Sequence, residues 1–99
     1  MKLGEIAHAR SGDKGSDANV GVIAYNQEGY ELLKKVLSEE KVKDYFASLG
    51  ISQAIRYEMP NILALNFVLK GILGRGGSES LRIDAQGKAL GQAILEMDL

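Results

Sequence analysis

The chain has 99 residues, 45% of them hydrophobic and 25% charged, which is the size and balance of one globular domain over residues 1–99 and argues against a disordered chain. Its formal net charge of −1 leaves no basic excess to hold a phosphate backbone, so we expect no nucleic-acid partner. The lack of cysteine excludes disulfides, thiolate metal ligands and a cysteine nucleophile. With no apolar run long enough to span a bilayer and no signal-peptide pattern, we expect a cytoplasmic protein without membrane contact.

Two strands are predicted near the start of the chain. Residues 2–10 form the first, and residues 20–25, which are apolar on both faces, form a second that belongs in the middle of a sheet. A polar connection of about ten residues lies between them, where hairpins usually need two to five. Ordered connections of that length in small domains often carry function.

A helical region follows the second strand. Asn26 is a suitable N-cap, and apolar residues then repeat at helical spacing as far as Leu37. Ser38 caps a further helical run, which ends at Gly50. The pattern fits either one kinked helix or two.

The middle of the chain contains a strand and an ambiguous apolar segment. Residues 51–59 alternate with a period of two, which predicts a strand, and Pro60 ends it because proline cannot donate to the ladder. Residues 61–73 are apolar nearly all round, and their length favours a buried helix, capped by Asn61, over a strand. Asn66 lies inside this apolar run, so we expect it to find hydrogen bonds, by capping or by bridging to another segment.

A loop, a short strand and a helix are predicted to complete the chain. Residues 74–77 form the glycine-rich loop and residues 80–83 the strand. Asp84 caps a last helix, whose apolar positions run from Ala85 to Met97.

This order of elements predicts an α+β domain with a ferredoxin-like, four-stranded antiparallel sheet and helices on one face. The ferredoxin-like plan is βαββαβ, and moving its last strand to the front gives ββαββα, a circularly permuted order that the chain matches if residues 61–73 are an excursion. In that arrangement the connection at 10–20, Gly50 and the start of the last helix share one end of the sheet. The loop that contains Arg75 falls at the opposite end.

The stretch from Arg10 to Gly21 is chemically unusual, because it combines glycines, carboxylates, a lysine and an asparagine. Glycines allow consecutive backbone N–H groups to turn inward and form a concavity for a phosphate or a carboxylate, and the last helix would point its positive end at the same place. The alternative is a long hairpin turn, which composition alone favours because glycine and aspartate are common in turns. The predicted ligand-binding residues are Arg10, Ser11, Gly12, Asp13, Lys14, Gly15, Ser16, Asp17, Asn19 and Asp84.

Candidates for catalysis lie in or beside the same stretch. His8, the one histidine, would act as a general base oriented by Asp13 or Asp17, with Lys14 as a further candidate, although a lone histidine on a strand is more often structural. A magnesium ion between the two aspartates ranks below a salt-bridged loop, so we expect neither a metal nor another cofactor. The arginines outside this stretch, Arg56, Arg75 and Arg82, are expected to be solvated. Arg75 lies between glycines, where it suits an anion contact.

Four segments of the sequence resemble one known family. They are HARSGDKGSDANVGVIA at 8–24, YEMPN at 57–61, ALNFVL at 64–69 and LRIDAQGK at 81–88. Together they resemble the C-terminal domain of acyclic terpene utilisation proteins of the AtuA type, a domain described as ferredoxin-like. In that family the domain usually follows a much larger N-terminal domain, so the resemblance implies a separately encoded small partner with a role near acyclic terpenoid or acyl-CoA breakdown. The resemblance supplies no catalytic residues.

Three hypotheses for function follow. The first is an accessory subunit that docks on an AtuA-type large subunit, is not catalytic alone and carries the anion-binding stretch. The second is a free-standing binding module or small enzyme for an anionic ligand, either CoA-linked or a carboxylate. The third is a structural domain that only oligomerises, and since a four-stranded sheet leaves its edges open we expect at least a homodimer.

Overall fold

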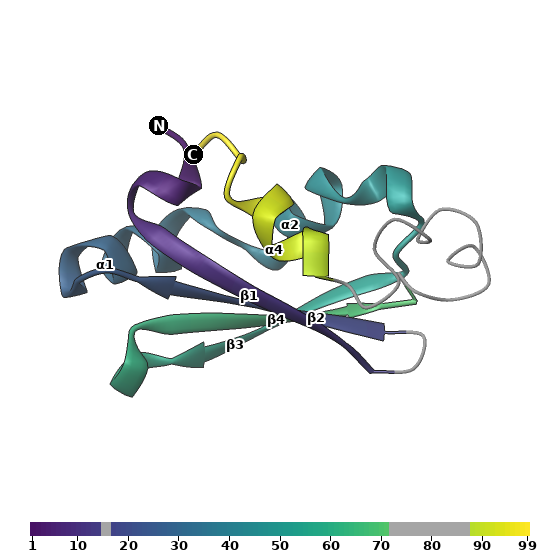
Figure 1. The fold of residues 1–99 in the computed structure, drawn as a ribbon, viewed down its shortest axis with the longest axis horizontal. Coiled ribbons are helices and arrows are strands. Elements are labelled where there is room, and N and C mark those ends of the chain that lie inside the picture. Colours follow the sequence, from purple (N-terminus) through teal and green to yellow (C-terminus); the bar gives the residue numbers. More distant parts are fainter. Residues whose placement is uncertain (15–16, 72–87) are drawn as a thin grey trace.

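The computed structural model describes residues 1–14, 17–71 and 88–99. Its framework is a four-stranded antiparallel sheet with the strand order β1-β2-β4-β3 (Figure 1). This order confirms the α+β, ferredoxin-like prediction in its permuted form, because the first strand takes the place beside β2 that the last strand of the βαββαβ plan would occupy. The strands are β1 (Ala7–Lys14), β2 (Asp17–Ala24), β3 (Gln53–Met59) and β4 (Ala64–Lys70).

Helices cover one face of this sheet, as Figure 1 shows. They are α1 (Gln27–Val36), α2 (Glu39–Tyr45) and α4 (Lys88–Ile94). Single 3₁₀ turns occur at Leu3–Glu5, at Ala47–Leu49 and, between β3 and β4, at Pro60–Ile62. The region after β2 forms two helices, each with its own N-cap. The side chain of Asn26 accepts a hydrogen bond from the Gly29 amide at 2.8 Å, and that of Ser38 accepts one from the Lys41 amide at 3.0 Å, so each helix has its own N-cap.

The core lies between the sheet and the helices. Alternation along β2 and β4 turns every second side chain toward the helical layer, where it is removed from water. Among the described residues, the largest fully buried side chains are Leu3, Val20, Val22, Tyr30, Leu33, Leu37, Val42, Leu65, Phe67, Leu69 and Ile94.

The prediction of a buried helix within residues 61–73 is wrong. The segment forms the turn Pro60–Ile62 and then strand β4, which pairs with both β2 and β3. A strand with neighbours on both sides is the kind that reads as a nearly continuous apolar run, which is why its length suggested a helix. Because β4 supplies the fourth strand, the sheet does not need the strand predicted at 80–83, which lies outside the described residues.

The predicted long connection between the first two strands is also wrong. The first strand runs to Lys14 and the second begins at Asp17, and the two pair in register from Ala7 with Ala24 to Lys14 with Asp17. Only Gly15 and Ser16 remain between them, and both lie outside the described residues. The backbone of this stretch therefore belongs to a hairpin ladder, and β2, paired on both edges, cannot turn its amides into a concave anion cup.

The end of β4 lies beside the tip of this hairpin. The Gly71 amide donates a hydrogen bond to Asp17 Oδ1 at 2.8 Å, and Lys70 Nζ lies 3.5 Å from Asp17 Oδ2. The chain thus enters the segment after Gly71 at the hairpin end of the sheet, whereas the sequence placed that connection at the opposite end. The glycine-rich loop at 74–77 and the predicted cap Asp84 lie outside the described residues.

The two ends of the chain meet on the helical side of the molecule (Figure 1). The Leu99 amide donates to the Met1 carbonyl at 2.8 Å, and the Leu3 amide donates to the Met97 carbonyl at 2.8 Å. Lys2 Nζ adds an ion pair with Asp98 Oδ1 at 3.3 Å. In the described part of the chain, no helix is both long and apolar enough to cross a membrane.

Candidate functional site

The face of the sheet that points away from the helices carries a row of polar side chains. The strand registers align Arg10 with Gly21, Gly21 with Asn66, and Asn66 with Tyr57, so one row crosses all four strands. Because these positions alternate with the buried ones, all four lie on the face opposite the core. We call this surface the open face.

Glycines make the floor of a shallow depression on the open face. A cavity of about 310 Å³ lies here, and Gly12 and Gly21 are among the residues that line it. A Cβ atom at Gly21 would lie 3.7 Å from Asn66 Oδ1, and one at Gly12 would lie 3.4 Å from Asn19 Oδ1. Each glycine is therefore flanked by the amide group of an asparagine on a neighbouring strand.

The polar side chains around this floor have unused hydrogen-bonding capacity. Arg10 is exposed, and Asn19 and Asn66 are half-buried. Within the described ranges, none of these three side chains makes a hydrogen bond or an ion pair with another described residue. The bridging role expected for Asn66 is thus not seen, because the residue lies on the open face and not within the core.

An apolar wall borders the same depression. It is formed by Ile23, Met59 and Ile62, of which Met59 is 40% exposed and Ile62 is 52% exposed. The turn that presents Ile62 is held in place, since Leu63 adopts the left-handed region with φ 57° and its carbonyl accepts a hydrogen bond from the Ala24 amide at 2.9 Å. A glycine floor surrounded by one charged and two amide side chains, with an apolar wall beside it, suits a molecule with one anionic end and one hydrocarbon end.

His8 lies on the open face, opposite the buried Ala7, as strand alternation requires. Its ring stacks on that of Tyr25, with centroids 5.7 Å apart and planes at 20°. His8 pairs with Ile23 while Asp17 pairs with Lys14, which separates the two by six residues of strand, or about 20 Å. The prediction that Asp17 orients His8 is therefore wrong.

Asp17 and Ser11 are occupied in tying elements together. Asp17 joins the hairpin to Lys70 and Gly71, as described above. Ser11 lies on the face toward α4, where its Oγ accepts a hydrogen bond from the Gly91 amide at 3.1 Å. Both contacts fix the position of the hairpin, and Ser11 lies on the other side of the sheet from Arg10.

The predicted ligand-binding residues thus have different surroundings. Arg10, Gly12 and Asn19 come together on the open face, where Asp17 holds the tip of the hairpin, while Ser11 borders the same cavity but turns its Oγ toward α4. The remaining predictions concern residues or side chains that the structure does not describe: Asp13, Lys14, Gly15, Ser16 and Asp84. Among the described residues, no group of three or more His, Asp or Glu side chains is placed to hold a metal ion.

Sequence reasoning missed the partners that other strands bring to Arg10. They are Asn66, from the segment taken for a helix, and the wall residues Met59 and Ile62. Gly21 was recognised only as the end of the unusual stretch. One signal was present in the sequence: an asparagine at an alternate position of an apolar strand indicates a polar site on the face away from the core.

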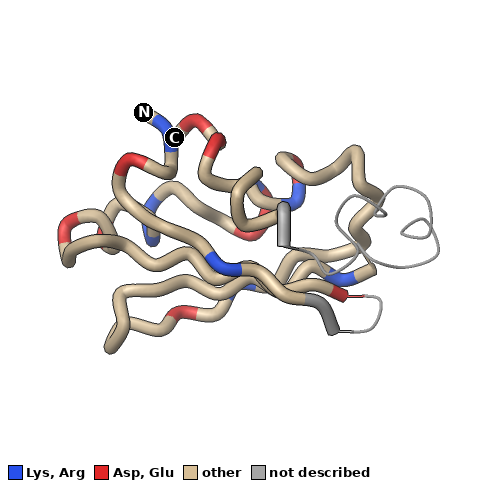
Figure 2. Tube along the Cα trace, viewed as in Figure 1, with Lys and Arg blue, Asp and Glu red and all other residues tan. Residues whose placement is uncertain are grey.

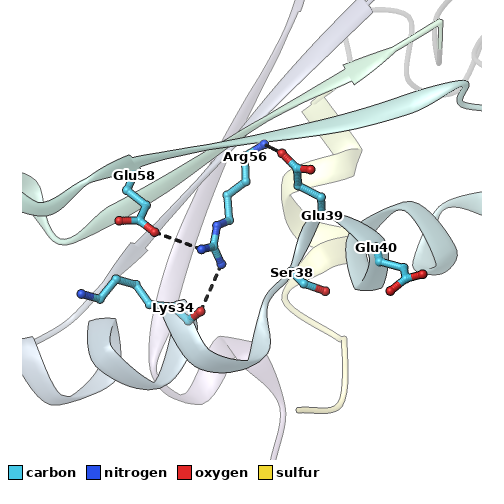
Figure 3. Close-up of a pocket in the computed structure, with 6 residues that line it drawn as sticks. All are labelled: Lys34, Ser38, Glu39, Glu40, Arg56 and Glu58. Carbon is cyan, nitrogen blue, oxygen red and sulfur yellow. Dashed lines mark hydrogen bonds and ion pairs between the residues drawn. The ribbon is translucent and has the colours of Figure 1, made fainter.

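A second and larger hollow lies beside α1 and α2, and Arg56 and Glu58 form an ion pair within it (Figure 3). It has a volume of about 630 Å³. Arg56 Nη1 donates to the carbonyls of Lys34 and Leu37 at 3.1 and 3.0 Å, and Nη2 lies 3.0 Å from Glu58 Oε2. Arg56 was expected to be solvated but is half-buried, and its donors are used inside the fold. The lining residues are Lys34, Ser38, Glu39, Glu40, Arg56 and Glu58.

The charge distribution sets the open face apart. Figure 2 shows charged residues gathered mainly in the helical layer and near the chain ends, with fewer along the strands. On the open face Asp17 and Lys70 pair with each other at the hairpin end, and Arg10 is the charged side chain among the described residues that line the glycine floor.

The fold defines a ferredoxin-like α+β domain, and in its described part the helices lie on one face of the sheet and the glycine-floored depression on the other. The model of the family described as the AtuA ferredoxin-like domain matches residues 1–99, and the chain belongs to this family. No curated protein and no solved structure matches the chain.

Proposed function

We propose that this domain is an accessory unit of an AtuA-type assembly and that it docks on the large AtuA-type subunit through its open face. The assembly would act in the breakdown of acyclic terpenoid or acyl-CoA compounds. The proposal assigns no reaction to this chain alone.

The observation that carries this proposal is the set of large apolar side chains that the open face leaves in water. Tyr25 is 62% exposed, Tyr57 51%, Ile62 52% and Met59 40%. Apolar side chains gathered on one face and bordered by polar groups are typical of a protein-interaction surface. Membership of the AtuA family supports a large AtuA-type subunit as the occupant.

The test is to co-express the chain with an AtuA-type large subunit and to measure complex formation by co-purification and by analytical ultracentrifugation at micromolar concentration. We expect a complex, and we expect Ile62→Asp to weaken it by at least about tenfold, because docking would bury an unpaired charge. Ile62 is half-exposed on a turn, so the substitution leaves the core intact.

Ser48→Asp is the matched control. Ser48 is exposed in the 3₁₀ turn Ala47–Leu49 on the helical side, and its substitution adds the same charge away from the open face. Equal weakening by both variants, or no complex with the unmodified chain, would contradict the proposal. A homodimer that Ile62→Asp dissociates would show that a second copy covers the face instead.

A second candidate function is supported by a separate observation. The unused capacity of Arg10, Asn19 and Asn66 around the glycine floor supports a module that binds a small anionic molecule. Binding and docking are compatible, since a large subunit seated on the apolar rim would enclose a shallow depression at the centre.

A further inference from the structure

We infer that the depression on the open face is a subsite for a small carboxylic acid, with its carboxylate held by Arg10, Asn19 and Asn66 and its hydrocarbon part against Ile23, Met59 and Ile62. This inference rests on the second candidate function, anion binding at this face, and is independent of docking. It places the anion on side chains, whereas the sequence placed it in a concavity of backbone amides, with Arg10 and Asn19 among the residues around it.

The spacing of the polar groups suits a carboxylate. Arg10 and Asn66 flank Gly21 on the two neighbouring strands, so their Cα atoms are separated by two strand spacings, or about 10 Å. A guanidinium donates two parallel hydrogen bonds to the two oxygens of a carboxylate, and an amide N–H₂ on the far side can add a further one. Gly21 leaves the space between them empty of side chain.

The same donors are a poor match for a phosphate group. Phosphate sites in proteins usually combine several backbone N–H groups with a positive charge. Here β2 is paired with β1 and with β4, so its amides are committed to the ladders. One arginine and two asparagine amides remain, which is the donor set of a singly charged anion.

The apolar wall beside the glycine floor favours a ligand whose carboxylate carries a hydrocarbon chain. Met59 and Ile62 are 40% and 52% exposed, and a hydrocarbon chain lying on them would remove apolar surface of both partners from water. A cavity of about 310 Å³ is small, at the lower end of the range for ligand pockets, so the acid itself must be small.

The test is a titration of the full chain, labelled with ¹⁵N, with sodium hexanoate up to about 10 mM, followed by NMR. We expect saturable shifts at the backbone amides of Gly12 and Gly21 and at the side-chain amides of Asn19 and Asn66. Hexan-1-ol, which lacks the charge, and inorganic phosphate, which lacks the chain, should each bind at least about tenfold more weakly.

Two variants locate the site. Arg10→Gln should weaken hexanoate binding at least about tenfold, because a charge-assisted hydrogen-bond pair is lost. Gly21→Ala should also weaken it, because a methyl group occupies the floor, and it should fold normally since its Cβ atom lies at an ordinary 3.7 Å from Asn66 Oδ1. Lys35→Gln removes an exposed positive charge from α1 and should leave binding unchanged.

Three results would contradict a carboxylate subsite in the depression. Hexanoate shifts that are absent at about 10 mM, that are unaltered in Arg10→Gln, or that phosphate reproduces with equal affinity would overturn the carboxylate subsite. None of these results bears on docking, because the large subunit is absent from this titration. Conversely, a failure to form the complex in the docking experiment leaves the hexanoate result standing.

Discussion

Arg56 links the C-terminal end of α1 to strand β3. Its guanidinium donates to the Lys34 and Leu37 carbonyls at the C-terminal end of α1 and to Glu58 on its own strand. The last carbonyls of a helix have no partner within the helix, so a cation placed there satisfies them and also interacts favourably with the helix dipole. The side chain is only 21% exposed, which limits the ability of water to replace these hydrogen bonds.

Replacing Arg56 by methionine should lower the free energy of unfolding by about 2 kcal/mol, because two partly buried carbonyls lose their donors while the apolar stem is kept. Arg56→Lys should recover part of the loss, since an ammonium is charged but lacks the planar fork. Urea denaturation measures both. Lys35→Met, on the exposed side of α1, is the control and should change stability by less than about 0.5 kcal/mol.

The contacts of Arg56 could not be predicted from the sequence. Alternation along 53–59 could place Arg56 on the helical side of its strand, but nothing local in the sequence shows that a helix ends beside it. The N-caps Asn26 and Ser38 were predictable, because a cap acts on amides two or three residues away. Contacts between segments distant in sequence depend on packing.

The exposed edge of the sheet at β3 is protected by a helix residue. β3 lies at the end of the strand order, and the backbone N–H of Arg56 points outward from it, where it donates to Glu39 Oε2 at 2.7 Å. An unpaired edge strand offers its amides to other chains, and a carboxylate that occupies one of them interrupts that row. The first turn of α2 thus closes part of the sheet edge.

Glu39→Ala should lower the free energy of unfolding by about 1–2 kcal/mol and should speed hydrogen exchange at the Arg56 amide. Glu39→Gln keeps an acceptor oxygen and should show a smaller effect on both. Glu40→Ala removes a neighbouring charge from the same helix turn, which controls for the helix dipole. If exchange at Arg56 were the same in Glu39→Ala and Glu40→Ala, the proposed edge contact would be wrong.

The sequence predicted the fold class correctly, but it did not predict strand β4 or the strand pairing within residues 10–20. Residues 64–70 were mistaken for a helix because a strand paired on both sides loses the polar alternation that marks a half-exposed one. Residues 10–20 were mistaken for a loop because glycine, aspartate and asparagine are typical of turns. On the open face those same residues are compatible with a strand, because a glycine there adds no side chain beside the neighbouring Asn19 and Asn66.

The candidate site was predictable only in half. Arg10 and Gly12 are two residues apart on β1, and Asn19 lies opposite Gly12 on β2. One hairpin therefore brings all three together. Asn66, Met59 and Ile62 come from the opposite half of the sheet, and their position depends on β4 lying next to β2. A site that spans non-consecutive strands cannot be assembled without the strand order.

In the described part of the molecule, helices cover one face of the sheet, the open face lies on the other side, and the two chain ends meet. The Leu99 amide and the Met1 carbonyl are 2.8 Å apart, so the termini are already in contact in the folded state. Joining two contacting ends costs the native state little, while it restricts the unfolded chain strongly.

A backbone-cyclised form, closed by a short glycine-rich linker between residues 99 and 1, should therefore be more stable by about 3 kcal/mol. Thermal and urea denaturation should both show the gain. The control is the linear chain with the same linker residues appended at one end, which should unfold as the original does. A cyclised form less stable than this control would mean that the ends are held apart in solution.

The meeting of the ends also fixes where any covalently attached polypeptide would emerge. Residues 1 and 99 leave the domain at one point, on the side of the helices. A larger polypeptide that preceded the domain, followed it or received it as an insertion would be tethered at that same point, and the bare side of the sheet would keep the same orientation toward the tether. In each of these arrangements the tether would leave from the helical side of the domain, not from the face that carries Arg10.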